Sequence, residues 1–364
     1  MLKKNMKKIN FYLFYLTNKY LIVNFFIISI FIIFINLLEL SRVISENEKN
    51  ILNFIYLSFL KYPSILNEII PFVTILGVAF LTRNLISNNE FVSMRNLGFS
   101  ILDIFKPILI AVFIMGLFFL FVINPLAVFM ETKYDDQLDK KDNSLYSIKI
   151  TDNEMWIKNK IDQQNSSFIN IKNINLRNMY ASNIIILQTK NDTNKFLMAE
   201  KGEFTNNIFL LKKVKYYDFK KEEYKSLAKY DLIINFNKEN ILNSISKYKL
   251  VPYYNYINHS KTLSKFNLYS SEIGLYYLSE VLKPIFTVVL AFVILGFSSK
   301  FQRNENFFKV LFVSISIGLL IFLLKEIITK LTISLTLNFL LSYLIIFLIP
   351  LLIGLYQIIK IENE

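Results

Sequence analysis

Apolar and polar residues alternate in large blocks along this chain of 364 residues. Two groups of three apolar segments flank a mostly polar stretch, roughly residues 131–272. Uncharged apolar segments of about 20 residues are typical of membrane-spanning helices, because that length crosses the hydrocarbon core of a bilayer. The pattern therefore predicts three spans in residues 1–130, a separate domain in residues 131–272, and three further spans in residues 273–364.

The six predicted spans differ in how clearly charges delimit them. The second and fourth contain short uncharged runs, 69–82 and 284–299, that become full spans only by extension. A hairpin that re-enters the membrane without crossing is the alternative for these two. Full crossings are favoured, because six of them place both termini on one side. The predicted spans are residues 21–38, 64–82, 107–130, 273–299, 310–324 and 331–359.

Lysine and arginine gather in the short loops on one side of the predicted membrane. They occur before span one, between spans two and three, between spans four and five, and after span six. Short cytoplasmic loops carry such an excess of positive residues. We therefore expect cytoplasmic termini and residues 131–272 on the outer side. The residues concerned are Lys3, Lys4, Lys7, Lys8, Arg83, Arg95, Lys106, Lys300, Arg303, Lys309 and Lys360.

The polar stretch between the two groups of spans has the pattern of an all-β domain. Short runs of β-forming residues are separated by clusters of Asn, Asp, Lys or Gly, such as residues 191–192 and 201–202. Their spacing suits an antiparallel sandwich, roll or barrel. Scattered acidic residues among the lysines indicate a solvated surface. The predicted strands are residues 145–150, 155–158, 168–171, 184–189, 195–199, 208–217 and 230–236.

Composition agrees with a membrane protein and excludes several kinds of chemistry. The chain is 54% hydrophobic, and its mean hydropathy is +0.40. Cysteine is absent and His259 is the one histidine, so thiolate and multi-histidine metal sites are excluded, and we expect no cofactor. His259 itself is predicted to be a solvated loop residue. Without a phosphate-binding loop or a hydrolase motif, the chain is not expected to be an enzyme.

A short segment between spans two and three, residues 87–98, has the signals of a cytoplasmic helix. Ser87 and Glu90 have the spacing of a capping box, in which each side chain bonds the other's backbone amide. Gly98 lies where a left-handed residue commonly ends a helix. We therefore predict a helix over about residues 87–98.

The same segment has an apolar stripe that something must cover. Phe91, Met94 and Leu97 would share one face of the helix. Two interpretations remain open at this point. The stripe packs against the ends of its own spans, or it docks into a groove on a cytoplasmic partner.

Few charges occur within or near the predicted spans. Charges at membrane depth are costly and are often functional. Most of these lie at predicted span ends, where a side chain that reaches the interface is the simpler explanation. Glu326 is followed by apolar residues and fits that explanation least. The charges are Glu39, Glu68, Glu280, Lys283, Lys325 and Glu326.

These features resemble the LptF/LptG (YjgP/YjgQ) family, the permeases of the lipopolysaccharide-exporting ABC transporter. The most specific similarity is a proline and Leu-Gly in residues 71–77, followed in residues 89–100 by the pattern S-E-x-x-x-M-[RQ]-x-x-G-x-S, with Asn89 in place of the first Ser. The resemblance covers nearly the whole chain. Shorter matches are residues 124–125, 155–158 and 282–285, and the start of span four and residues 316–327 are more similar to LptG.

The resemblance implies the fold and a set of functional residues. It implies six transmembrane helices with an inserted periplasmic jellyroll, and a coupling helix that meets a cytoplasmic ATPase similar to LptB. It also implies a lipid cavity formed with a homologous second subunit. The implied coupling residues are Glu90, Phe91, Met94, Arg95, Leu97 and Gly98. The implied substrate-cavity residues are Phe31, Ile35, Arg42, Lys133, Phe322 and Glu326.

The cations near the outer ends of the spans depart from the family pattern. Arg42 has acidic neighbours, and Lys133 is the nearest cation to where the family often has arginines. This implies different contacts to lipid A phosphates, or a lipid A with fewer of them.

The resemblance further implies an inner-membrane permease subunit with an LptC-like jellyroll protein as a third partner, and no nucleic acid. The alternative is a membrane-anchored β domain that acts as an adaptor or assembly factor. One span would suffice as an anchor, so six spans argue against this alternative.

Overall fold

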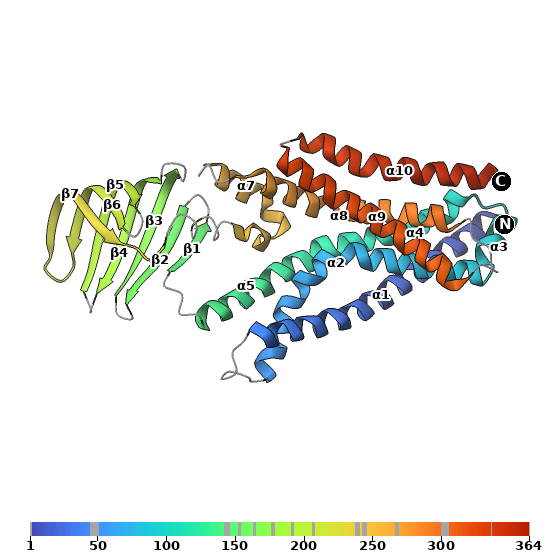
Figure 1. Ribbon diagram of the computed structural model, residues 1–364, viewed down its shortest axis with the longest axis horizontal. Helices are drawn as coiled ribbons and strands as arrows, with labels where there is room; N and C mark the ends of the chain where they lie inside the picture. Colours follow the sequence, from blue (N-terminus) through green and yellow to red (C-terminus); the bar gives the residue numbers. More distant parts are fainter. Residues whose placement is uncertain are drawn as a thin grey trace. The chain divides into compact units, whose positions relative to one another are not determined.

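The computed structural model divides the chain into two compact units (Figure 1). The membrane unit comprises Met1–Tyr134 and Leu275–Glu364, and the β unit comprises Asp135–Gly274. The predicted turn at 191–192 and the basic residues Lys300 and Arg303 lie outside the described residues. The structure describes residues 2–43, 51–141, 146–151, 154–162, 165–175, 179–190, 193–205, 208–236, 241, 246–265, 269–299, 306–335 and 337–363.

Six helical segments of the membrane unit are long and apolar enough to cross a bilayer, as predicted. Apolar residues surround most of these helices, as expected where lipid is the solvent. The segments are Lys7–Leu40, Leu52–Ser87, Ile101–Gln137, Ser271–Ser298, Phe308–Ser334 and Phe339–Glu362. They belong to α1 (Leu2–Val43), α2 (Ile51–Ser87), α4 (Ile101–Phe118) with η2 (Phe119–Ile123) and α5 (Asn124–Lys141), α8 (Ser271–Ser298), α9 (Phe307–Ser334) and α10 (Phe339–Asn363).

The second and fourth predicted spans, for which a re-entrant hairpin was the alternative, are continuous helices. α2 has 37 residues and α8 has 28, and at about 1.5 Å per residue both exceed the roughly 30 Å hydrocarbon core. Proline inside α2, at Pro63 and Pro71, does not end it. The predicted sixth span was wrong at its start, because residue 331 still lies in α9 and α10 begins at Phe339.

The third span changes its winding halfway along. The backbone amide of Asn124 donates to the carbonyl of Phe119, five residues earlier, and this defines the single π-turn η2. Pro125 follows and has no amide hydrogen to donate. A π-turn inserts one extra residue and redirects the side chains around it. Asn124 therefore lies directly after the π-turn, and its side chain is buried.

The two groups of spans share one continuous core in the membrane unit. α2 packs against α1 and also against α9, and a cluster of buried side chains draws on α1, α2, α4, α8, α9 and α10. Two glycines allow close approach across the groups. A β-carbon on Gly116 would lie 2.8 Å from Pro284 of α8, and one on Gly318 would lie 2.8 Å from Ile75 of α2.

The described part of the β unit contains seven antiparallel strands, and each predicted strand overlaps one of them, although residues 234–236 of the last prediction lie beyond the end of β7. Strand order follows the sequence, β1 to β7, in one sheet. The predicted strands were too short, because polar residues at both ends continue the pairing. The strands are β1 (Tyr146–Thr151), β2 (Glu154–Asp162), β3 (Asn165–Asn175), β4 (Tyr180–Lys190), β5 (Thr193–Thr205), β6 (Ile208–Asp218) and β7 (Glu223–Ile233).

The sheet curls, so that its end approaches its beginning. The side chain of Asn159 in β2 donates to the carbonyl of Ile233 at 3.0 Å and accepts from the amide of Asn235 at 3.0 Å. One face of the sheet becomes a dry interior filled by alternate apolar residues, as the two-residue period of strands requires. The interior residues include Met155, Ile157, Ile169, Ile171, Ile184, Ile186, Leu197, Phe209, Leu211 and Leu232.

Short helices return the chain from the sheet to α8. They are η3 (Ser246–Leu250), η4 (Tyr253–Asn255) and α7 (Tyr256–Lys265). The Tyr248 hydroxyl donates to Glu272 at 3.0 Å, and burial together with this hydrogen bond raises the pKa of Tyr248 to about 12. His259 lies half-buried in α7 rather than in a solvated loop, and burial lowers its pKa.

Candidate coupling helix and substrate-contact residues

The helix α3 (Glu90–Asn96) begins three residues later than predicted. Ser87 is the last residue of α2, and its hydroxyl donates to the carbonyl of Asn84 rather than capping α3. Asn89 occupies the N-cap position with φ of 57°, in the left-handed region that asparagine tolerates. The predicted capping box is therefore wrong. A left-handed asparagine makes the sharp turn from α2 into α3 instead.

The C-terminal end of α3 matches the prediction. Gly98 has φ of +89°, a left-handed conformation that suits glycine. The amide of Phe99 donates to the carbonyl of Met94 at 3.2 Å, and the amide of Gly98 donates to that of Arg95 at 2.8 Å. This pair of bonds is the Schellman motif. A left-handed residue therefore precedes α3 and another follows it, at Asn89 and at Gly98.

The predicted apolar stripe is divided between the core and the surface. Phe91 and Met94 are buried in the core cluster of the membrane unit. Leu97 follows the last turn of α3 and is 63% exposed, and Val92 is 54% exposed. The interpretation that the stripe packs against its own spans therefore holds for Phe91 and Met94. Only Val92 and Leu97 present apolar surface outward.

The two charged residues of α3 have different surroundings. Glu90 accepts a hydrogen bond of 2.9 Å from the hydroxyl of Tyr12 in α1. Arg95 is exposed. Glu90 thus ties α3 to the first helix, whereas Arg95 is available to a partner. In Figure 1, α3 lies at the same end of the membrane unit as both chain termini.

The predicted substrate-cavity residues occupy separate places on the membrane unit. Phe31 and Ile35 project from α1 and are more than half exposed. Phe322 on α9 is half-buried, with its ring centroid 4.9 Å from that of Phe72 on α2. Glu326, one turn further on, pairs with Lys325 at 3.2 Å. α1 and α9 both pack against α2, so these faces share one neighbour.

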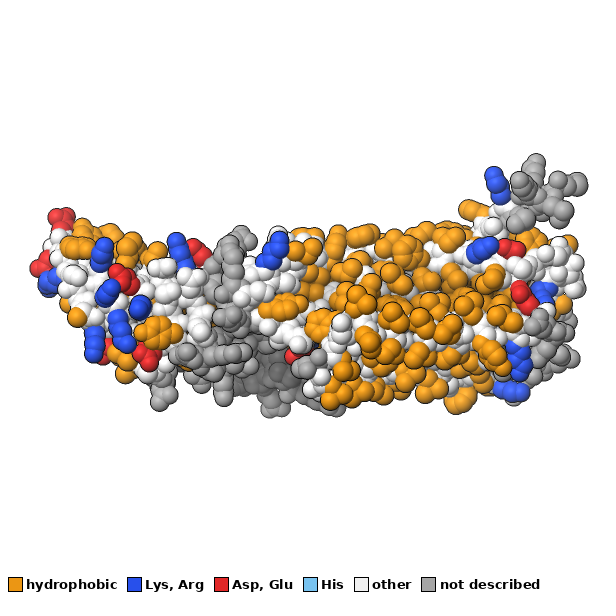
Figure 2. All heavy atoms as spheres, turned by 90° about the horizontal axis from the view of Figure 1, so that it is seen from above, with side chains coloured by type: hydrophobic (Ala, Val, Ile, Leu, Met, Phe, Trp, Pro, Cys, Tyr) orange, Lys and Arg blue, Asp and Glu red, His pale blue; other side chains and the backbone are white. Residues whose placement is uncertain are grey.

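The two predicted headgroup cations occupy different positions on their helices. Arg42 is close to the end of α1, and its side chain lies outside the described residues. Lys133 in α5 is exposed, and its ammonium lies 4.3 Å from the ring centroid of Phe129. On the face shown in Figure 2, hydrophobic side chains cover most of the membrane unit, and charged ones gather at the end that carries α3.

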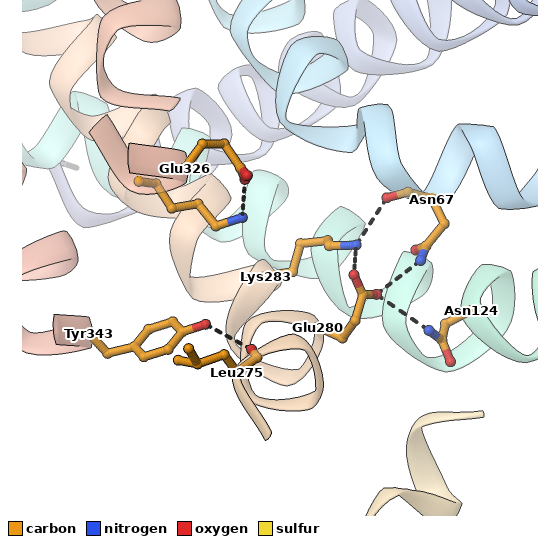
Figure 3. Close-up of polar contacts among 8 residues, drawn as sticks. Asn67, Asn124, Leu275, Glu280, Lys283, Glu326 and Tyr343 are labelled. Atoms are coloured by element: carbon orange, nitrogen blue, oxygen red, sulfur yellow. Dashed lines mark hydrogen bonds and ion pairs between the residues drawn. The ribbon is translucent and has the colours of Figure 1, made fainter. Parts of the chain in front are cut away.

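A buried polar cluster is the feature that the sequence did not predict (Figure 3). Glu280 and Lys283 of α8 pair with each other, and their side chains are only 7% and 12% exposed. Glu280 also accepts from the amide groups of Asn67 at 2.9 Å and Asn124 at 3.4 Å. Lys283 donates to the backbone carbonyl of Asn67 at 3.0 Å. The prediction that these two charges reach an interface is wrong.

Isolated asparagines inside apolar spans were the signal that could have revealed this cluster. Asn67 lies within α2, and Asn124 follows the π-turn. An amide at membrane depth needs a partner. The partner cannot be identified from sequence, because residues 67, 124 and 280 meet only through packing. Within the described parts of the chain, no three His, Asp or Glu residues come together as a metal site would require.

Among the described residues, six helices that are long and apolar enough to span a bilayer, with a β domain inserted between them, indicate a multi-pass membrane protein. The sequence matches the family described as lipopolysaccharide export system permease LptF/LptG over residues 11–360. The chain therefore belongs to that family, which is one of permeases rather than enzymes. A comparison with curated proteins found no match. Because the family includes both LptF and LptG, the greater similarity to LptG stays a prediction.

Proposed function

We propose that this chain is a permease subunit of an ABC transporter that extracts lipopolysaccharide from the inner membrane. It would pass the lipid to a periplasmic bridge toward the outer membrane, with both termini in the cytoplasm. The observation that carries the proposal is α3, a short helix whose Phe91 and Met94 are buried in the core of a six-helix membrane unit, in a chain of this family. Such a helix can transmit force from a separate, LptB-like ATPase.

The coupling surface of α3 would consist of Val92, Arg95 and Leu97, because these residues are exposed. Phe91 and Met94 would not touch the ATPase; they would attach α3 to the core of the membrane unit. Glu90 and Gly98 would fix its orientation through Tyr12 and the C-terminal cap. A few central side chains usually carry most of the binding energy in such a contact.

Leu97→Asp tests this surface. We expect roughly tenfold weaker binding of the ATPase, because a charge replaces an apolar contact at the centre of the interface. Asn96→Asp is the matched control, since it adds the same charge next door without removing apolar surface. Affinity is measured by titrating the ATPase against the purified permease. Unchanged affinity for Leu97→Asp would refute the docking role of α3.

The lipid would contact the exposed apolar side of α1, with a homologous permease subunit completing the cavity. Phe31 and Ile35 provide this surface. α9 offers Leu320, which is 60% exposed, whereas the predicted residue Phe322 is half-buried and less accessible. Glu326 and Lys133 remain proposed headgroup contacts, as does Arg42.

Photo-crosslinkers at Phe31, Ile35 and Leu320 should capture lipopolysaccharide in membranes. Leu344 on α10 is 51% exposed and serves as a control of similar accessibility. We expect several-fold less capture at Leu344, because it would face bulk lipid. Equal capture at all four positions would remove the support for a dedicated cavity.

The β unit would bind an LptC-like periplasmic protein by strand addition at β1, which is an edge of the described sheet. Proline at Ser147 and, separately, at Ile148 tests this edge. Adjacent residues of an edge strand direct their amides alternately to the partner strand and outward. One of the two variants should therefore stay folded yet lose the partner. If the folded variant keeps full binding, β1 is not the docking edge.

A further inference from the structure

The cluster around Glu280 joins three helices from both groups of spans. Asn67 comes from α2, Asn124 from the π-turn junction with α5, and Glu280 and Lys283 from α8 (Figure 3). Residues 67 and 124 precede the β unit in sequence, whereas residues 280 and 283 follow it. The cluster is therefore a direct polar link between the first three spans and the last three.

Each charged group in this link is fully engaged with fixed partners. One carboxylate oxygen of Glu280 accepts from Lys283, and the other accepts from Asn67 and Asn124. Lys283 also donates to the Asn67 carbonyl, a backbone group that cannot turn away. Separation of α8 from α2 would leave an unpaired charge buried in an apolar surrounding, which is costly. The bonding pattern thus favours one arrangement of these helices.

Packing around the link leaves no room for sliding. The β-carbon position of Gly116 lies 2.8 Å from the Cα of Pro284, the residue after Lys283. Gly318 of α9 approaches Ile75 of α2 just as closely. Phe72 and Phe322 also pack across α2 and α9, with their ring centroids 4.9 Å apart. Close contacts of this kind deform little.

We propose that Glu280 is a positioning residue for transport, which holds the two groups of three spans together as one rigid body. The movements of the transport cycle then occur at the outer surface of the membrane unit, against a neighbouring subunit, and not between α2 and α8 or α9. The proposal rests on the transport function proposed above and adds to it how this chain moves.

A disulfide between α2 and α9 tests rigidity directly. A β-carbon on Gly318 would lie 2.8 Å from both γ-carbons of Ile75. A cysteine sulfur at position 75 would occupy one of those γ positions, so Ile75→Cys with Gly318→Cys should form a disulfide on oxidation. The natural chain contains no cysteine, so no other thiol competes. We expect lipopolysaccharide export by the oxidised and the reduced protein to differ by less than about twofold.

Glu280→Gln tests the link itself. Loss of the negative charge leaves Lys283 without its ion-pair partner, and we expect export to fall roughly tenfold. If Glu280 acts by holding the helices together, the oxidised Ile75→Cys/Gly318→Cys disulfide should restore most of the export in Glu280→Gln. Reduction should abolish the rescue. A residue that contacts the lipid or moves a proton would not be replaced by a distant disulfide.

Charge exchange provides a second variant for the same link. Glu280→Lys with Lys283→Glu keeps the ion pair, but it places a carboxylate beside the Asn67 carbonyl. We therefore expect this variant to insert normally and to export poorly until the disulfide is oxidised.

The outcomes distinguish failure of the proposed transport function from failure of the rigid-body inference. If the natural chain, reconstituted with its homologous permease subunit, its ATPase and the LptC-like protein, exports no lipopolysaccharide from proteoliposomes, the transport function fails. If the natural chain exports and the oxidised disulfide stops export, the two groups of spans must move apart and the rigid-body inference is wrong. Failure of the disulfide to rescue Glu280→Gln would also overturn the positioning role.

Discussion

Polar side chains in the membrane unit form hydrogen bonds of two kinds. Asn24 donates to the Tyr20 carbonyl one turn earlier in α1, which satisfies its amide without linking helices. Ser29 also donates to a carbonyl of α1, but it accepts from the Tyr62 hydroxyl of α2 at 2.6 Å as well. Asn36 and Asn67 reach α2 and α8 instead, where they donate to Ser58 and Glu280. In lipid, a polar group with no local partner must find one on another helix. Position on the helix surface decides which asparagines build tertiary structure.

A single buried carboxylate has a comparable role in the β unit. Asp218 ends β6, and it accepts from the Tyr216 hydroxyl at 3.1 Å and from the amide of Lys220 at 3.0 Å. Burial alone would raise the pKa of Asp218, but these hydrogen bonds together lower it below its ordinary value. The ionised form therefore stabilises the fold. This stabilisation is present above the ordinary aspartate pKa of about 3.9 and is lost as the pH falls through the lower folded-state pKa.

Asp218→Asn should therefore destabilise the β unit at pH 7 and have little effect at strongly acid pH. Trp156 in β2 is the one tryptophan of the chain, so its fluorescence reports unfolding of this unit in the full-length protein. Denaturant titrations of both proteins between pH 7 and pH 2 provide the comparison. A stability difference that stays constant across this range would contradict the link to ionisation.

At the scale of single elements, α3 depends on its C-terminal cap. Gly98 has no heavy atom within 4 Å of its β-carbon position, so a side chain there meets no steric obstacle. The cost of Gly98→Ala is therefore conformational, about 1–2 kcal/mol for a left-handed residue. Hydrogen exchange of the Gly98 and Phe99 amides should accelerate roughly tenfold.

Gly98→Asn is the matched variant for this prediction. Asparagine tolerates the left-handed region better than alanine, so exchange should accelerate less. Equal exchange in the two variants would show that backbone conformation does not limit the stability of this turn.

The interior of the β unit depends on a close contact at Gly202. A β-carbon there would lie 2.6 Å from both Ile184 and the ring of Phe209. Phe209 also stacks on Phe204, with ring centroids 3.9 Å apart. Gly202→Ala should therefore destabilise the unit by about 1–3 kcal/mol, as measured by denaturant unfolding of Trp156 fluorescence.

Phe209→Leu tests whether the ring is the obstacle. Leucine leaves more space beside residue 202, so the double variant should lose less stability than the two single variants added together. Additive losses would place the strain of Gly202→Ala elsewhere, for example on Ile184.

The sequence predicts the positions of helices and strands well, but it predicts less well which of their faces are internal. Runs of β-forming residues between turn signals located all seven described strands, although burial does not alternate regularly in β3 or β7. They did not decide which face is internal at β6. Ile208 is 42% exposed, whereas its neighbour Phe209 is buried. Which face each residue of β6 joins depends on the register, because a shift of one residue exchanges the faces.

The candidate site was predictable from sequence only where it depends on local backbone conformation. Gly98 was identified because few residues adopt its conformation, and the short helix before it followed from local sequence. The predicted capping box is wrong because Ser87 belongs to α2. Where α2 ends depends on how far its buried face extends, and local sequence does not give that. The link through Glu280 needed the packing of three helices, and no local pattern contains that information.

At the scale of the whole molecule, hydropathy distinguishes the two units along the sequence. The β unit is inserted in the sequence between two groups of helices that form one membrane core. The helices before and after the insertion pack into one cluster. The β unit therefore connects to the membrane unit through two chain segments, one before β1 and one after α7. Such a connection suits a chain in which the membrane unit and the β unit bind different partners.

Orientation in the membrane is the last prediction. With α3 and both termini at one membrane end, we expect Ser226 on β7 to face the periplasm and Glu362 near the end of α10 to face the cytoplasm; both are exposed. Because the chain has no cysteine, Ser226→Cys and Glu362→Cys each introduce a single thiol. In intact spheroplasts an impermeant thiol reagent should label Ser226→Cys alone, and after permeabilisation it should label both. The lysine and arginine of the short loops are the physical reason, since the membrane potential and anionic lipids retain them inside. Labelling of Glu362→Cys in intact spheroplasts would reverse the orientation and place α3 away from any cytoplasmic ATPase.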